Sequence, residues 1–306
     1  MPINRKILKA NAKQMMGDTQ PAVWGVTLVF LLATVWLSKV VDLVNPVRQQ
    51  MESIYSAMQQ ASINADQGAM LSAMYQMQAL ARTPGFTVAI LVSVLIGLYS
   101  KVVGWGYTGY SLRVTREGTG DIGDLFSRFY MAGKIIGTEI LQGIFVFLWA
   151  LAGILPLSIL AVTVGTQNDA LVALFLFIGV IVASVLAIIA AYRYAMIPYI
   201  LLDDPDCPIM EAFRRSKSIM KGRKGELFVL ELSFFGWSFL AILAVGLATA
   251  ILPSGIVATV VALVIATACN LFLVPYQQLT FSQWYDEVRP QPQPADDQGA
   301  NRDELY

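Results

Sequence analysis

The sequence predicts an all-α fold, a polytopic transmembrane helical bundle of about six spans, and three observations support it. Apolar residues make up 56% of the chain and charged residues only 14%, whereas soluble domains average roughly half and a quarter. Uninterrupted apolar runs, such as residues 170–192, exceed the ~20 helical residues that cross a bilayer core of about 30 Å. Lys and Arg are strongly segregated along the chain. We therefore expect lipid to surround this fold.

Six segments satisfy the length of a spanning helix. They are residues 22–44, 86–103, 135–160, 170–192, 227–252 and 256–279. We expect Pro156 to kink or end the third segment and Pro253 to end the fifth, because proline removes a helical hydrogen bond. The basic N-terminus is not followed by a small-residue cleavage pattern, so the first segment is expected to be an uncleaved span.

The basic residues predict the orientation of these spans. Seventeen Lys and Arg residues lie in the N-terminal segment, the second and fourth connections and the tail, whereas the opposite side carries only Arg48 and Arg82. Because basic loops remain in the cytoplasm, both the N-terminus and the C-terminus are expected there, with the protein in a cytoplasmic (inner) membrane. The net charge is zero, so we expect no nucleic-acid partner.

Residues 1–289 are expected to form a single integral membrane domain. Residues 45–85 are its longest external connection, and the polar segment 64–68 predicts a turn between two helices of an external hairpin. Methionines at helical spacing favour an amphipathic hairpin that uses Met for packing. A Cu(I) site is the alternative, because thioether sulfur suits soft metals. Residues 290–306, rich in Pro, Gln and Asp, predict a disordered cytoplasmic tail.

An internal repeat predicts three successive units, each an amphipathic helix at the inner surface followed by a two-span hairpin. Two blocks 87 residues apart carry similar residues at the same offsets: Asp124, Phe126, Arg128, Lys134 and Glu139 in the first, and Glu211, Phe213, Arg215, Lys221 and Glu226 in the second. The even-numbered spans also share an inner-end motif, which reads Gly106-Tyr107, Pro198-Tyr199 and Pro275-Tyr276.

Residues 207–222 predict the clearest of these amphipathic helices. We expect Asp206 to cap it, and its apolar stripe, Phe213 included, to face the acyl chains. Four flanking cations would then contact lipid headgroups: Arg214, Arg215, Lys217 and Lys221. Binding of anionic lipids at the cytoplasmic face is one interpretation. A simple topological anchor is the other and is preferred, since positive-inside segregation already demands these charges.

Two polar residues within the spans form a candidate intramembrane site. Glu231 lies about 6–8 Å along the fifth span, where it pairs with Arg193 or Lys134 or serves as a protonatable group. Asn270 lies deep in the sixth span and is expected to hydrogen-bond between helices rather than bind a ligand.

The chain offers little of the usual site chemistry. It contains no histidine, which removes the commonest general base and the usual zinc and haem ligands. Cys207 and Cys269 fall at different depths, so no disulfide is expected. Paired carboxylates, metal-ligand clusters and phosphate loops are not evident either. We therefore expect no catalytic, metal-binding or cofactor-binding residue, no cofactor, and no enzymatic activity.

A group of short motifs resembles a known family. The motifs are residues 194–206, Glu211–Ser216, Leu232–Trp237, Pro275-Tyr276 and Trp284-Tyr285, with Asp121–Phe126 upstream. Together they are similar to an uncharacterised family of bacterial integral membrane proteins, one defined by a domain of unknown function. The resemblance covers most of residues 1–40 and 104–288, and segments 45–85 and 157–190 depart from it. It implies a bacterial membrane location and supplies no activity.

These observations favour a non-catalytic membrane protein that organises partners or lipids. Its expected partners are the bilayer, with anionic lipids at the cytoplasmic face, and an unidentified membrane protein. A transporter or channel for a solute is the alternative, although the signature of mitochondrial carriers and inverted repeats are not evident. A polar cavity at mid-depth that Glu231 and Asn270 both reach would favour transport.

Overall fold

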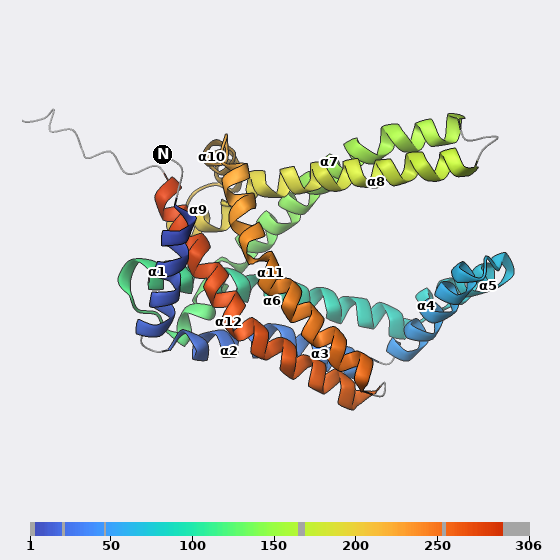
Figure 1. The fold of residues 1–306 in the computed structure, drawn as a ribbon, viewed down its shortest axis with the longest axis horizontal. Helices are drawn as coiled ribbons and strands as arrows, with labels where there is room; N and C mark the ends of the chain where they lie inside the picture. Colours follow the sequence, from blue (N-terminus) through green and yellow to red (C-terminus); the bar gives the residue numbers. More distant parts are fainter. Residues whose placement is uncertain (1–3, 20–21, 46, 165–168, 253–254, 290–306) are drawn as a thin grey trace, which may run out of the picture.

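A computed structural model describes residues 4–19, 22–45, 47–164, 169–252 and 255–289. Within these ranges every regular element is helical, and six helices are long and apolar enough to cross a membrane. The predictions of an all-α fold and of six spans are therefore confirmed (Figure 1). The predicted disordered tail, residues 290–306, lies outside the described residues.

The first span is interrupted by a short π-helix, η1, and two 3-10 helices, η2 and η3, precede the third span. The elements in chain order are α1 (Arg5–Asp18), α2 (Val23–Leu31), η1 (Leu32–Trp36), α3 (Leu37–Val44), α4 (Arg48–Ile63), α5 (Gln67–Ala81), α6 (Pro84–Glu117), η2 (Ile122–Leu125), η3 (Ser127–Met131), α7 (Ala132–Val164), α8 (Asp169–Tyr194), α9 (Ile197–Asp203), α10 (Ile209–Ile219), α11 (Lys224–Ile251) and α12 (Ile256–Val288).

Several helices are longer than the spans within them. α6 has 34 residues and α12 has 33, which corresponds to about 50 Å against a bilayer core of about 30 Å. The motifs at Gly106 and Pro275 therefore lie inside continuous helices and do not end them. α7 also continues through Pro156 to Val164, so Pro156 does not end this helix. α11 ends at Ile251, just before Pro253, as predicted.

Most of the buried core lies where the long helices meet at one end of the molecule. We call this region the hub; it consists of α1, η2, η3, α9, α10, residues 102–114 of α6 and residues 273–288 of α12. Its two clusters are centred on large residues such as Trp105, Leu201 and Trp284 in one and Tyr110 in the other. Both ends of the described chain, α1 and the end of α12, lie at the hub (Figure 1).

The close packing of the hub requires glycine at position 106. A Cβ atom there would lie 2.0 Å from the backbone oxygen of Leu125 in η2. Carbon and oxygen atoms cannot approach so closely, so any side chain at this position must push η2 away from α6. Gly106 therefore fixes the connection that precedes the third span.

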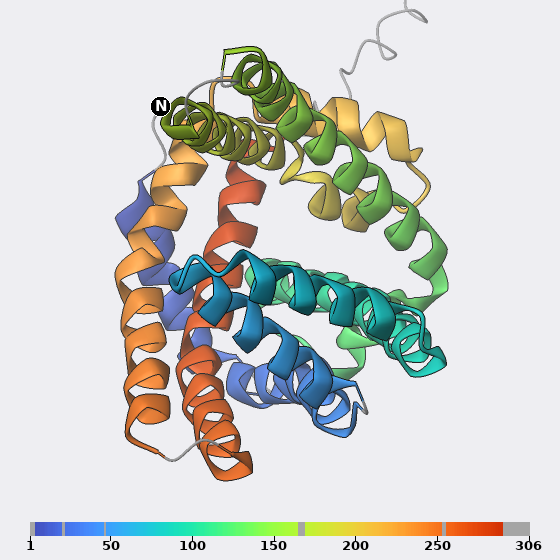
Figure 2. The ribbon, with the colours of Figure 1, turned by 90° about the vertical axis from the view of Figure 1, so that its right-hand side faces the viewer.

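Away from the hub, several spans diverge, although the first span stays beside α12, where the Trp36 indole donates to the Thr267 hydroxyl at 2.8 Å. Figures 1 and 2 show the α7–α8 pair, the α11–α12 pair and α6 leaving the hub in different directions. In each span the most apolar window has only 6% to 22% of its residues buried by the rest of the chain. The α7–α8 pair itself is close, because a Cβ on Gly153 would lie 2.7 Å from the Cα of Ala183. Much apolar surface is left for lipid or a partner to cover.

The predicted hairpin between the first two spans is present as α4 and α5. Its turn follows Ile63, and the Asp66 side chain caps α5 by accepting a hydrogen bond from the amide of Ala69 at 3.0 Å. Ile54 and Leu80 form its small core, against which Met51, Met58 and Met77 pack. Another methionine of the hairpin, Met74, is 54% exposed. Three methionines of the hairpin therefore have the packing role that the sequence predicted.

The segments before the third and fifth spans differ in structure. The first forms η2 and η3, and its Phe126 is 41% exposed. The second forms α10, and its Phe213 is only 4% exposed. The repeat of sequence is therefore not matched by a repeat of local structure here, and the arrangement in three units stays a prediction.

Candidate functional site

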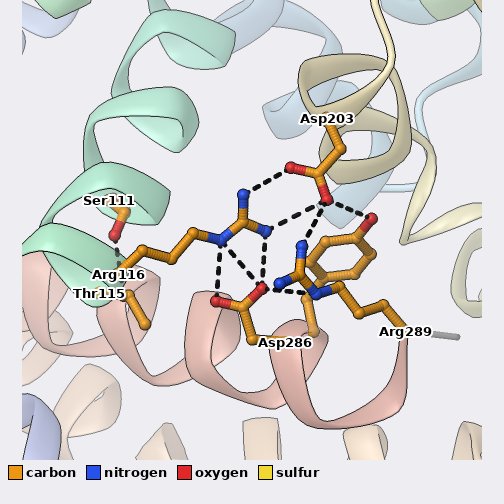
Figure 3. A network of polar contacts seen from close by, with 7 residues as sticks. Ser111, Thr115, Arg116, Asp203, Asp286 and Arg289 are labelled. Carbon is orange, nitrogen blue, oxygen red and sulfur yellow. Dashed lines mark hydrogen bonds and ion pairs between the residues drawn. The ribbon is translucent and has the colours of Figure 1, made fainter. Parts of the chain in front are cut away.

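An ion-pair network joins the hub ends of three helices that are far apart in the sequence (Figure 3). Arg116, in the last turn of α6, binds two carboxylates. Its Nη1 donates to Asp203 Oδ1 at 2.7 Å, and its Nη2 donates to Asp286 Oδ1 at 2.6 Å. Asp203 ends α9 and Asp286 lies near the end of α12. One guanidinium thus connects the second span, the helix after the fourth span, and the sixth span.

Two further side chains complete this network. Arg289 Nη1 donates to Asp203 Oδ2 at 3.2 Å, and the Tyr285 hydroxyl donates to the same oxygen at 3.0 Å. The two aspartate side chains are 23% and 19% exposed, so the pairs are shielded from bulk water more than ordinary surface salt bridges. The network can hold the three helices in register.

The amphipathic helix predicted at 207–222 is present as α10, with two corrections. It begins at Ile209 after Pro208, so Asp206 is not its cap. Its apolar stripe does not face lipid either: the Phe213 ring packs 5.0 Å from that of Tyr194 and 5.3 Å from that of Phe145. The hub core occupies this face because α8 and α7 continue inward beneath α10.

The basic residues of α10 remain on its outer side. Arg214 has a side chain that is 77% exposed, and Lys217 and Lys221 are exposed as well. Arg215 differs, because its Nη1 donates to Asp204 Oδ2 at 3.0 Å, and this hydrogen bond raises the pKa of the guanidinium. Lys217 and Lys221 are therefore free to meet anionic groups from outside. Arg214 pairs with Glu211 at 3.6 Å but stays exposed enough to meet them as well.

The two polar residues predicted within the spans do not come together. Glu231 contacts neither Arg193 nor Lys134 in the described structure; its carboxylate accepts a hydrogen bond from the Tyr192 hydroxyl. Lys134 instead donates to the carbonyl of Pro205. Asn270 donates to Ala266 in its own helix at 2.8 Å, and it does not line the cavity that contains Glu231. The expected pairing of Glu231 was wrong, as was the interhelical role of Asn270.

A polar groove that the sequence prediction did not include lies between the first two spans. Two cavities of about 660 and 530 Å³ share Asp42 and Ser93. The larger lies beside the start of α4, and the smaller runs inward past Ser38 to Ser100. Among the described residues, the hydroxyls of these three serines have no hydrogen-bond partner. Serines at 38, 93 and 100 in otherwise apolar spans were the available signal.

Charged pairs mark the two ends of this groove. Near its outer end Lys39 and Asp42 pair at 3.4 Å. At its inner end Lys101 pairs with Glu139 at 2.8 Å, and Glu139 also accepts a hydrogen bond from the Trp105 indole at 2.9 Å. The π-helix η1 forms part of the wall, and π-helical turns are common at functional sites. The groove is a second candidate site.

Comparison with known proteins gives one match. The sequence model of the family described as "Protein of unknown function (DUF975)" matches residues 1–291. This confirms the resemblance to an uncharacterised family, and the match also includes segments 45–85 and 157–190, which had departed from it. The searches of curated proteins and of solved structures found no match.

Proposed function

Because the chain belongs to the DUF975 family of proteins of unknown function, we propose from its structure that it is a non-catalytic organiser of membrane partners or lipids. The hub would hold the chain together, and the diverging helix pairs would present their apolar surfaces within the bilayer. The supporting observation is the uneven packing: the buried residues concentrate in the hub, whereas the spans bury 6% to 22% of their most apolar windows.

Large side chains along the spans carry this argument further. Phe147 in α7, Phe177 in α8 and Ile242 in α11 are each more than 60% exposed. An organiser leaves such residues available to neighbouring molecules. Lipid tails or the helices of another membrane protein would cover these surfaces.

We propose further that the hub lies in the cytoplasm of a bacterial cell, below the cytoplasmic membrane. Within the described chain, the Lys and Arg residues that predict orientation lie at the hub or beside it, apart from Arg48 in α4 and Arg82 after α5, and positive residues favour the cytoplasmic side. Arg214, Lys217 and Lys221 would then meet anionic headgroups, each contributing about 1 kcal/mol near an anionic leaflet.

Photo-crosslinking in native membranes tests the organiser proposal. A photoreactive residue at Phe177 or Phe147 should form adducts with lipid or with one recurrent membrane protein. The same residue at Phe234, which is 1% exposed, should react only within the chain and serves as the matched control. Purely intramolecular adducts at Phe177 and Phe147 would show that the spans close on themselves and would contradict the proposal.

The lipid component has its own test. The protein should retain phosphatidylglycerol after purification, as seen by native mass spectrometry, and a variant with Arg214, Lys217 and Lys221 changed to Gln should retain much less. Changing Arg215 alone should have little effect, since that side chain is already paired with Asp204. Equal retention by the triple variant would exclude headgroup binding by α10.

The groove between the first two spans favours a second candidate function, that of a transporter or channel for a solute. Unpartnered hydroxyls at Ser38, Ser93 and Ser100 can hydrogen-bond water or a polar solute within the membrane. The groove extends from the start of α4 to Lys101.

Cysteine accessibility tests whether this groove is hydrated. Ser93→Cys and Ser100→Cys should react with a small impermeant thiosulfonate added from the α4–α5 side if water fills the groove. Ser184→Cys, on the exposed surface of α8 away from the groove, is the matched control and should not react. Failure of both groove positions to react would remove the basis for transport.

A further inference from the structure

A cavity of about 320 Å³ between α8, α11 and α12 has an unusual lining. It contains one carboxylate, Glu231, and four aromatic rings: Tyr192, Phe228, Phe235 and Phe281. The rings of Tyr192 and Phe228 meet edge to face, with their centroids 6.0 Å apart. An anionic group among aromatic rings is a combination that recognises organic cations.

The carboxylate of Glu231 has no cationic partner. Among the described residues, no Lys or Arg nitrogen lies within 4.0 Å of it, and its one hydrogen-bond partner is the Tyr192 hydroxyl. Glu231 lies seven residues beyond Lys224, the first residue of α11, and therefore about 10 Å along the helix. A charge in such an apolar segment is costly unless it is paired. A cation bound in the cavity would supply such a partner.

The same part of α11 already holds one ammonium group, on the neighbouring side of the helix. The Lys9 ammonium, from α1, lies 4.0 Å from the centroid of the Phe234 ring and donates to the Ser233 carbonyl at 3.0 Å. Phe234 is buried by the hub, whereas the adjacent Phe235 is 63% exposed toward the cavity side. The buried face thus receives its cation from the chain, and the cavity face has none.

We propose that this cavity binds the ammonium group of an amphiphilic or soluble organic cation. The Glu231 carboxylate pairs with the positive nitrogen, and the rings of Phe228, Phe235 and Phe281 surround its alkyl substituents. Ser238 and Gln277, which also line the cavity, hydrogen-bond the remainder of the headgroup. The inference does not depend on the organiser proposal, because a transporter could hold the same ligand.

The ammonium group could come from an aminophospholipid or from a free organic cation, and two assays distinguish these sources. Native mass spectrometry in dodecyl maltoside compares retention of phosphatidylethanolamine with that of phosphatidylglycerol carrying the same chains. The protein used is the variant with Arg214, Lys217 and Lys221 changed to Gln, so that α10 does not contribute to phosphatidylglycerol retention. Calorimetric titration compares choline with 3,3-dimethylbutan-1-ol, its uncharged isostere. Preference for phosphatidylethanolamine alone supports a lipid site, and preference for choline alone supports a site for soluble cations.

Three variants link the binding to the cavity. Glu231→Gln, which can still accept the hydrogen bond of Tyr192, should weaken ammonium binding by about tenfold or more. Phe235→Leu should weaken it roughly three- to tenfold through the lost cation–π contact. Glu226→Gln, five residues earlier and outside the cavity lining, should leave it unchanged. All three should remain monodisperse, because the altered side chains lie outside the hub core.

Three results would overturn the inference. One is equal binding of the charged ligands and their uncharged or anionic counterparts. Another is unchanged ammonium binding by Glu231→Gln. The third is failure of the wild-type protein to bind either phosphatidylethanolamine or choline.

Discussion

Replacing Arg116 by Ala should weaken the hub substantially. The side chain pairs with both Asp203 and Asp286, and its removal leaves these partly buried carboxylates facing each other with only Arg289 nearby. Breaking a fully buried ion pair costs about 3–5 kcal/mol. Since Arg116 is 31% exposed, we expect about 2–3 kcal/mol after allowance for solvent screening. For a chain of this size that corresponds to a fall in Tm of roughly 5–10 °C.

Thermal unfolding in detergent, followed by tryptophan fluorescence, measures this effect, because Trp105 and Trp284 are buried in the hub. Arg214→Ala is the matched control, as its side chain is 77% exposed, and its Tm should match the wild type. Adding Asp203→Asn to Arg116→Ala should restore part of the lost Tm by removing carboxylate repulsion. If Arg116→Ala unfolded at the same temperature as Arg214→Ala, the network would not be holding the helices together.

Three further predictions follow from the fold. Gly106→Ala should destabilise the protein by about 3 kcal/mol, because the added Cβ meets a backbone oxygen. Gly104→Ala is the control and should leave the stability unchanged, because there is open space around this residue. Unfolding temperatures of the two variants measure the difference. In intact cells an impermeant maleimide should label Ser62→Cys in the α4–α5 hairpin and spare Ser218→Cys in α10 until the cells are permeabilised; the opposite pattern would reverse the proposed orientation. At neutral pH, Cys207 should react with iodoacetamide much more slowly than Ser218→Cys. The Cys207 side chain is 3% exposed, and burial raises the pKa of its thiol, which lowers the fraction of reactive thiolate. Equal reaction rates of the two cysteines, measured by mass spectrometry, would contradict the burial of Cys207.

The sequence was sufficient to predict the spans because hydropathy and length report directly on the surrounding lipid. It did not predict that α6 and α12 continue beyond the predicted spans to Glu117 and Val288. The segments beyond the spans mix polar and apolar residues, and their burial depends on neighbours that are distant in the chain. Tyr107 illustrates this: it looks like an interfacial residue, yet it lies in the hub and its hydroxyl contacts that of Thr27 at 2.8 Å.

The candidate site was less predictable, for the same physical reason. Arg116 could be counted as a basic residue that sets orientation, but its partners lie 87 and 170 residues away, and pattern along the chain does not encode such pairs. Glu231 was correctly singled out as an unusual charge, whereas its neighbours could not be inferred, because they come from α8 and α12. The sequence prediction placed Phe213 against lipid. It was wrong because an amphipathic stripe packs equally well on protein.

The central claim is that the spans face lipid while the hub holds the chain together. Spin labels at Phe177 and Leu247, both more than 60% exposed, and at Leu201, which is fully buried in the hub, can be compared in lipid nanodiscs by electron paramagnetic resonance. The account predicts that dissolved oxygen, which concentrates among acyl chains, relaxes the two span labels strongly and the Leu201 label weakly. Weak relaxation by oxygen at both span positions would mean that the spans pack into a closed bundle, and would contradict it.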